Sequence, residues 1–109
     1  MAKTSVKLSE VFNPCNLTDY SVGGVVSQQI IKNDAGNVTL FSFDEGQGLS
    51  EHSAPFDAIV HILEGEVRVT LGGEPFDLKA GEMIIMPANV QHALLATKQF
   101  KMLLTMIKG

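Results

Sequence analysis

The residues best suited to chemistry in this chain are two histidines, His52 and His92, each on a β-rich segment that follows a glycine turn. An imidazole binds transition metals through a neutral nitrogen, and a pKa of about 6.5 also suits it to acid and base chemistry. If the two segments converge, both rings enter one pocket. The sequence therefore predicts a site at which His52 and His92 either hold a metal ion or orient a carboxylate or hydroxyl of a small organic ligand.

The elements that must position these rings are short β-strands separated by turn residues. Branched and alternating residues predict strands over residues 25–32, 38–44, 59–63, 67–71, 76–78, 83–86, 92–97 and 100–107. Gly72 and Gly73 fit a tight two-residue hairpin turn, because both can take positive φ. Residues 1–24 are less regular, with at most one or two amphipathic helical turns over residues 6–12. The pattern predicts an all-β sandwich or barrel.

Composition favours a single domain with one core. The chain has 109 residues, of which 45% are hydrophobic. Only 18% are charged, below the roughly 25% usual for globular domains, which suggests that a partner subunit covers uncharged surface. We therefore expect a homodimer. A net charge of −4 without any Lys/Arg cluster argues against nucleic acid as a partner.

Three further features limit the class of protein. Cys15 is the single cysteine, so one chain cannot build a disulfide framework or a thiolate zinc cage, and we expect it to be a small apolar filler. The first residues lack the apolar stretch of a signal peptide, and no apolar run approaches the roughly 20 residues of a membrane helix. These features predict a cytoplasmic protein that does not associate with membranes.

Two blocks of residues resemble the paired motifs of the cupin superfamily and cover roughly residues 40 to 97. They are Gly46, His52 and Gly65 in the first block, and Gly81, Pro87 and His92 in the second. The chain is most similar to small single-domain cupins of unassigned function. The resemblance implies a double-stranded β-helix, or jelly-roll barrel, commonly dimeric, with a pocket inside.

The resemblance also exposes gaps in the metal site. Metal-binding cupins present two histidines and a glutamate from the first block and one histidine from the second. His52 matches the first histidine and His92 the last, but Ala54 stands at the second histidine position and Ala58 at the glutamate position. In the second block, Asn89 replaces a glycine and Ala96 replaces the terminal asparagine. Two of the four protein ligands are therefore missing.

His61 and Asp57 are the remaining candidates for a third ligand. Each lies an odd number of residues from Ala58, so strand alternation sends its side chain to the opposite face unless a bulge shifts the register. Without such a shift, His61 is a surface or interface histidine. The methionines Met83, Met86, Met102 and Met106 are expected to be core residues that also make the pocket apolar.

Three hypotheses of function stay open, and the sequence assigns no catalytic residue. The first is a small-molecule-binding cupin in which His52 and His92 anchor the ligand and hold one divalent transition metal (Zn, Ni, Fe or Mn). The second is a metal-dependent isomerase or dioxygenase, which needs three protein ligands and therefore His61 or Asp57 as well. The third is a sensory or structural dimer without metal, and a filled barrel interior would favour it.

Overall fold

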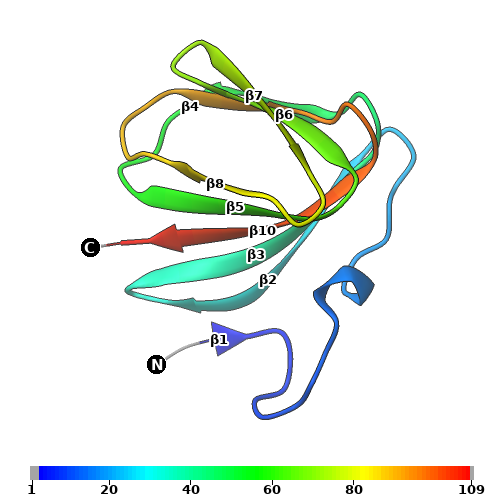
Figure 1. Ribbon diagram of the computed structural model, residues 1–109. Coiled ribbons are helices and arrows are strands. Elements are labelled where there is room, and N and C mark those ends of the chain that lie inside the picture. The colour runs from blue at the N-terminus through cyan, green and yellow to red at the C-terminus, as the bar shows by residue number, and fades with distance from the viewer. Residues whose placement is uncertain (1–2, 109) are drawn as a thin grey trace.

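The protein, described over residues 3–108 by a computed structural model, consists of two antiparallel sheets that face each other as a barrel (Figure 1). The six-stranded sheet contains, in order across it, β1 (Lys3–Thr4), β2 (Val25–Asn33), β3 (Gly36–Phe43), β10 (Phe100–Ile107), β5 (Asp57–Glu64) and β8 (Met83–Met86). The four-stranded sheet contains β4 (Gly48–His52), β9 (His92–Leu95), β6 (Glu66–Leu71) and β7 (Glu74–Lys79). The predicted all-β jelly-roll barrel is thus confirmed.

The predicted strands are all present, and those over residues 83–86 and 100–107 have the predicted bounds. Strand β4 carries His52, which was expected on a β-rich segment, but no strand with bounds was predicted there. It is an edge strand paired only with β9, and four of its five residues are exposed. Without a buried face it has no alternation of apolar and polar residues, so the usual sequence signal of a strand is missing.

The N-terminal segment carries little helix. A single 3₁₀ turn, η1 (Pro14–Asn16), begins where the Asn13 side chain accepts a hydrogen bond from the backbone N–H of Cys15. The helical turns predicted over residues 6–12 are absent, since Leu8 and Val11 are exposed and find no surface to pack against. Among residues 3–108, no helix is long and apolar enough to cross a bilayer.

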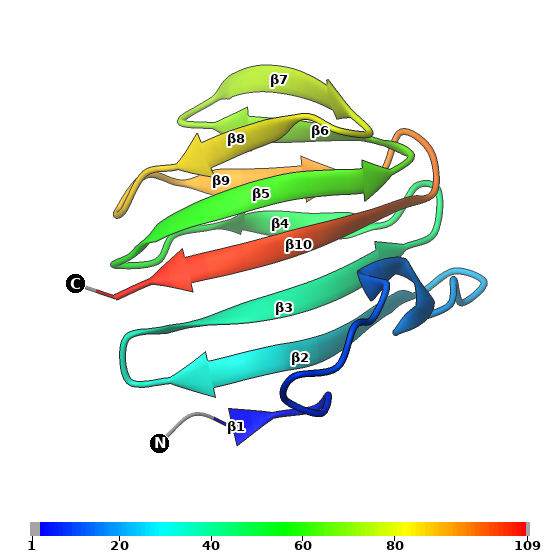
Figure 2. The same ribbon diagram turned by 60° about the horizontal axis from the view of Figure 1, so that its bottom comes forward.

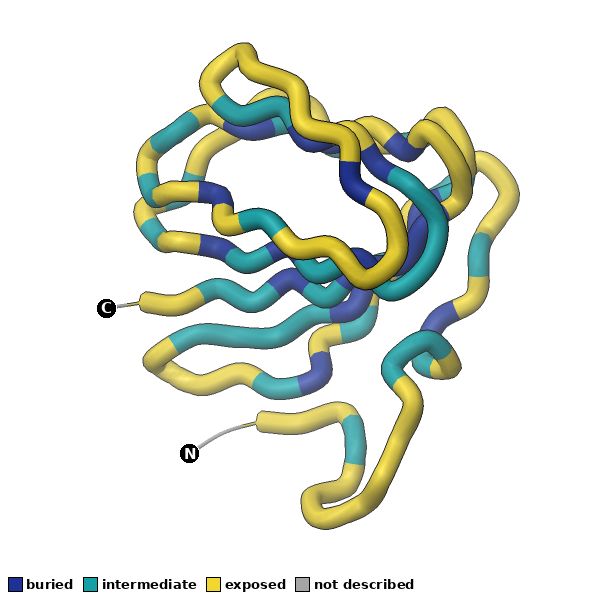
Figure 3. The backbone as a smooth tube through the Cα atoms, viewed as in Figure 1, coloured by how far each residue is buried: buried dark blue, intermediate teal, exposed yellow. Residues whose placement is uncertain are grey.

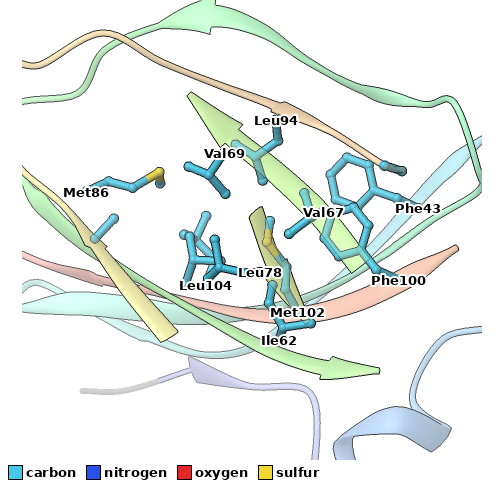
Figure 4. Close-up of a cluster of buried hydrophobic side chains, with 13 residues drawn as sticks. Phe43, Ile62, Val67, Val69, Leu78, Met86, Leu94, Phe100, Met102 and Leu104 are labelled. Carbon is cyan, nitrogen blue, oxygen red and sulfur yellow. The ribbon is translucent and has the colours of Figure 1, made fainter. Parts of the chain in front are cut away.

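The core lies between the two sheets and is packed most densely at one end. Burial alternates most clearly along β5 and β6, whose inward positions are buried (Figure 3). The rings of Phe43 and Phe100 stack with their centroids 4.5 Å apart, and Figure 4 places them at the opposite end of the cluster from Met86. The Phe43 end is therefore closed by aromatic packing, and any opening must lie toward Met86.

The outer face of β3 and β10 is covered by residues 13–20, here called the N-terminal strap (Figure 2). The ammonium group of Lys101 donates hydrogen bonds to the backbone carbonyls of Cys15 and Thr18, at 2.6 and 2.7 Å. The Thr18 hydroxyl is hydrogen-bonded to the hydroxyl of Ser42, and both residues are buried. A lysine that is only 6% exposed thus ties the strap to the sheet.

Candidate functional site

His52 and His92 lie side by side across the edge of the four-stranded sheet. The two residues are direct cross-strand partners in β4 and β9, after a register shift between Leu49 and His52. Their Nε2 atoms are 3.0 Å apart, and the rings meet edge to face with centroids 4.2 Å apart. The pairing of two strands from distant parts of the chain therefore brings the two imidazoles together.

Backbone carbonyls decide which nitrogen of each ring faces the partner. Nδ1 of His52 lies 2.7 Å from the carbonyl oxygen of Ser50, and Nδ1 of His92 lies 3.3 Å from that of Val90. A carbonyl can only accept, so each contact favours a proton on Nδ1 and a lone pair on Nε2. Two lone pairs 3.0 Å apart repel unless a proton or another cation lies between them. The pair is therefore built to attract one positive charge.

The two rings differ in exposure, and burial changes the basicity of His92. His92 is only 6% exposed, whereas His52 is open to solvent. Burial lowers the pKa of His92, and a positive charge on His52 would lower it further, against a smaller opposing effect of the hydrogen bond to Val90. His92 is consequently neutral at physiological pH, which is the form of imidazole that binds metals.

Both histidines line a cavity of about 70 Å³ inside the barrel. Its remaining walls are apolar and come from both sheets and from the segment before β5. They are Leu49, Ala54, Phe56, Ala58, Met86, Leu94, Met102, Leu104 and Met106. The interior is therefore not completely filled, and its polar groups converge at the histidine pair. Phe56 was missed from the sequence because it lies in a loop, where no periodicity indicates which way a side chain points.

Ala54 and Ala58 face this cavity, as expected of the two positions at which the resemblance places the missing ligands. Ala58 is buried on β5, with Met86 of β8 and Met106 of β10 as its direct neighbours on either side. The motif positions thus point where metal ligands would be needed, but these two side chains have no donor atom. The ligand set is therefore incomplete because these side chains lack donor atoms, although the backbone at both positions is correctly placed.

Asp57 and His61 are not brought to the histidine pair. Their neighbours Ala58, Val60 and Ile62 fill the inner face of β5, so Asp57 and His61 occupy its outer face. The Asp57 carboxylate instead accepts a hydrogen bond of 2.8 Å from the backbone N–H of Ala88. The register shift between β5 and β10 falls beside Lys101 and Met102, beyond both residues. Within residues 3–108, no three His, Cys, Asp or Glu side chains gather as a metal cluster.

Met83 also lies outside the barrel, which corrects the expectation that it belongs to the core. It is 58% exposed on the outer face of β8, whereas Met86, three residues further on, is 3% exposed. Three residues is an odd number, so the pleat of the strand sends the two side chains to opposite faces. Met86, Met102 and Met106 are the methionines that line the cavity.

Asn89 preserves the corner at which the resemblance would place a glycine. Its φ is +64°, in the left-handed region that asparagine tolerates better than most residues. Its backbone N–H donates a 2.8 Å hydrogen bond to the carbonyl of Ala54, and this bond joins the second block to the first. Ala96, at the asparagine position, is buried and exchanges backbone hydrogen bonds with Gly46 and Gln47. Both departures are accommodated by the backbone.

A wider hollow of about 550 Å³ lies beside β6 and β7, away from the histidines. It is open to solvent and lined mainly by charged residues, among which Arg68 and Asp77 form a two-bonded ion pair at 2.8 and 3.2 Å. Because these charges neutralise each other on an exposed surface, the hollow offers little selectivity. The smaller cavity at the histidine pair is the better candidate for a binding site.

Comparison with known proteins supports the same architecture. A family model described as a cupin domain matches residues 39–108. A conserved protein of unknown function from Streptococcus pyogenes is 31% identical, with a TM-score of 0.92 over 97% of this chain and 93% of that chain. A cupin 2 conserved barrel domain protein from Leptotrichia buccalis is 40% identical, with a TM-score of 0.87 over 89% of this chain and 47% of that chain.

A match to a curated protein is more limited. The polyketide synthase CurC from Streptomyces cyaneus is 35% identical over 48 residues, which make up 43% of this chain and 31% of that protein. The chain thus matches less than a third of the length of this relative.

Proposed function

Because the chain belongs to the cupin family, we propose that it binds a small organic molecule inside the barrel, with His52 and His92 as the polar anchor. The observation that carries this proposal is the meeting of the two imidazoles at the wall of an otherwise apolar cavity. Ligand sites in proteins commonly combine apolar walls with a few converging polar groups. The histidine pair supplies orientation, and the apolar wall supplies most of the contact area.

The cavity sets limits on the ligand. A volume of about 70 Å³ is below the roughly 300–1,000 Å³ of sites for drug-sized molecules, so the buried part of the ligand has only a few non-hydrogen atoms. Its polar end carries a hydroxyl or a carboxylate, because a hydroxyl can donate a hydrogen bond to an Nε2 lone pair and a carboxylate is attracted by the positive charge that the pair can take up. The flexible methionines let the walls adapt to an apolar remainder.

The same two imidazoles are the residues that would hold one divalent transition metal. Two metal–nitrogen bonds of about 2.0–2.1 Å would enclose an angle of about 95° when the Nε2 atoms are 3.0 Å apart, which fits neighbouring positions on one ion. The donor set fits less well, because Ala54 and Ala58 add neither a third imidazole nor a negative charge. A dication bound here completes its coordination with water or ligand oxygens and is held weakly.

A metal-dependent isomerase or dioxygenase is less well supported. Such a site needs a third protein ligand, and Asp57 and His61 both belong to the outer face of β5. Without such a ligand, the imidazole pair could still transfer protons. Binding is therefore the function that the residues favour.

The proposal is tested by titrating 15N-labelled protein with propanoate, butanoate and hexanoate while following the imidazole and backbone resonances. We expect saturable shifts of the His52 and His92 signals and of residues around the cavity. His52→Ala and His92→Ala should each abolish the shifts, whereas His61→Ala on the outer face should preserve them. Shifts that are unaffected by the first two substitutions, or no saturable shift with any of these acids and their corresponding alcohols, would contradict the proposal.

We further infer that the protein is a homodimer joined through the outer face of β8, β5 and β10. This outer apolar face is formed by the outward side chains of Ile59, Met83, Ile85, Leu103 and Ile107, of which Met83, Ile85 and Ile107 are more than half exposed. An exposed apolar patch over three strands marks an interaction site. Its central residues Ile59 and Ile85 carry no charge, and His61 lies on the same face between Leu103 and Met83. Two copies related by a two-fold axis would bring these apolar residues into contact with each other.

A further inference from the structure

We propose that the barrel cavity is a site for a monovalent copper ion, Cu(I), bound by the imidazoles of His52 and His92 and the thioethers of Met86 and Met106. The inference rests on one part of the proposed function, namely that the histidine pair is the polar anchor of the cavity. It adds the chemical class of the metal and two ligands that the family motifs do not contain.

The two methionines flank the position at which a carboxylate ligand is missing. On β8, Met86 is the direct partner of Ala58, and on β10, Met106 is the direct partner of the same alanine. All three side chains line the cavity that also contains the histidines. Figure 4 shows the side chain of Met86 extending into the barrel with its sulfur inside. The small side chain of Ala58 therefore leaves the space between two thioethers open.

The donor chemistry selects a soft ion. Thioethers are weak ligands for Mg²⁺, Mn²⁺ and Zn²⁺ but suit Cu(I), and imidazole nitrogen also binds copper well. The walls of the cavity contribute no carboxylate that could neutralise a dication. The solvation cost of burying an ion grows with the square of its charge, so a monovalent ion loses about one quarter of what a divalent ion of equal radius loses.

The spacing of the histidines calls for additional ligands. Two imidazoles on opposite sides of a two-coordinate ion would hold their Nε2 atoms about 4 Å apart, with metal–nitrogen bonds of about 2.0 Å. The observed separation is 3.0 Å, which is too short for an ion midway between the two nitrogens and leaves coordination positions for further ligands. Both histidines and both methionines line the same cavity, and methionine has three side-chain torsions with which to bring sulfur to the ion.

The test is a Cu(I) titration of untagged, reduced protein under anaerobic conditions, in competition with the chromophoric chelator bicinchoninate. We expect one Cu(I) per chain, and sulfur as well as nitrogen neighbours in the X-ray absorption spectrum of the complex. The variant with Met86→Leu and Met106→Leu conserves side-chain volume and should weaken Cu(I) binding at least about tenfold, as loss of metal-site interactions commonly does. Its fold is checked by circular dichroism.

The matched control is Met83→Leu, which changes a methionine on the outer face of the same strand and should leave Cu(I) binding unchanged. If the double variant loses its fold, the single variants Met86→Leu and Met106→Leu replace it, each with a smaller loss of affinity. Absence of stoichiometric Cu(I), or Cu(I) binding that is insensitive to both methionines, would overturn the inference. The small-molecule proposal fails separately, since its measure is the response of His52 and His92 to organic acids and alcohols without copper.

Discussion

His92 is buried while His52, its direct cross-strand partner, is exposed to solvent. The two rings touch through their Nε2 atoms, yet only the outer ring can be hydrated when it takes up a proton. Burial lowers the pKa of His92, and a positive charge on His52 would lower it further. The inner ring is therefore held in the neutral form, with a lone pair available at Nε2.

The pH dependence of stability should report this arrangement. The pKa of His92 is lowered on folding, so the unfolded chain binds more protons than the folded one between the folded pKa and about 6.5. The contribution of His92 is complete above about pH 6.5 and is lost as the pH falls through the folded pKa. Urea unfolding at pH 7.5, 6.5 and 5.5 should show a falling free energy of unfolding, and His92→Asn should reduce the fall.

The control for this experiment is His61→Asn, which removes a histidine that does not line the cavity and so separates the loss of His92 from the loss of any histidine. The lowered pKa values of the exposed carboxyls Asp44 and Asp77 act from about pH 4 downward and lie outside the chosen range. An equal fall in wild type and His92→Asn would mean that protonation of His92 does not oppose folding.

Restoring the missing ligands should create a divalent metal site. The variant with Ala54→His and Ala58→Glu places a third imidazole and a carboxylate at two positions that already line the cavity beside the histidine pair. We expect Ni²⁺ binding at least about a hundredfold tighter than in the wild type, measured by calorimetry, because two donors and one negative charge are added. Without metal the variant should melt at a lower temperature, since position 58 is buried, and Ni²⁺ should reverse that loss.

A variant with Ala54→His and Ala58→Gln keeps the size of the new side chains but not the charge, and it should bind Ni²⁺ more weakly than the glutamate variant. Equal binding by wild type and the glutamate variant would mean that positions 54 and 58 do not share a metal with His52 and His92.

The sequence predicts the framework of the site because the framework depends on local rules. The φ angles of Gly72 and Gly73 are +55° and +85°, as the two-residue turn between β6 and β7 demands. Along β10, alternation places Met102 and Met106 inward, as predicted, together with Leu104. Such patterns depend only on residues that are neighbours in the sequence, so they can be predicted without a structure.

The remainder depends on contacts between distant segments. Ser42 faces away from the barrel interior, yet it is completely buried, because Thr18 of the N-terminal strap packs on it. The burial of Lys101 has the same cause, and no local pattern distinguishes it from an exposed lysine on a strand. The position of Met86 and Met106 beside Ala58 likewise follows from the order of strands in the sheet. Strand order is a property of the whole chain.

Gly65 should be far less replaceable than Gly46, although both have φ near +80°, at +81° and +84°. A Cβ on Gly65 would lie 1.8 Å from the carbonyl oxygen of Gln99, whereas one on Gly46 would meet nothing within 4 Å. Gly46→Ala should cost about 1–2 kcal/mol of unfolding free energy for its left-handed backbone. Gly65→Ala should cost at least about 1–3 kcal/mol more, because backbone must move. Equal losses of unfolding free energy in the two variants, measured by urea unfolding, would show that the clash at Gly65 has no effect.

Lys101 should stabilise the fold much more than Lys98. Lys101→Met leaves the buried carbonyl of Thr18 and the half-buried carbonyl of Cys15 without their donor, which should cost about 1–3 kcal/mol and release the N-terminal strap to proteolysis. Lys98→Met removes only an exposed ion pair with Glu66, at 3.8 Å, and should change stability by less than about 1 kcal/mol. A strap that stays protected in Lys101→Met would show that the buried ammonium does not hold it.

The proposed dimer should separate when charge is placed on the outer apolar face. Ile85 is 60% exposed and pairs with Ile59 at the middle of that face, so Ile85→Glu in both copies sets two carboxylates into one apolar contact. We expect wild type to have the mass of a dimer and Ile85→Glu that of a monomer in light scattering coupled to gel filtration. Leu95→Glu is the matched control, because Leu95 is an exposed leucine on β9 in the other sheet. A monomeric wild type would contradict the dimer. A dimer that is disrupted by Leu95→Glu but not by Ile85→Glu would place the interface on another surface.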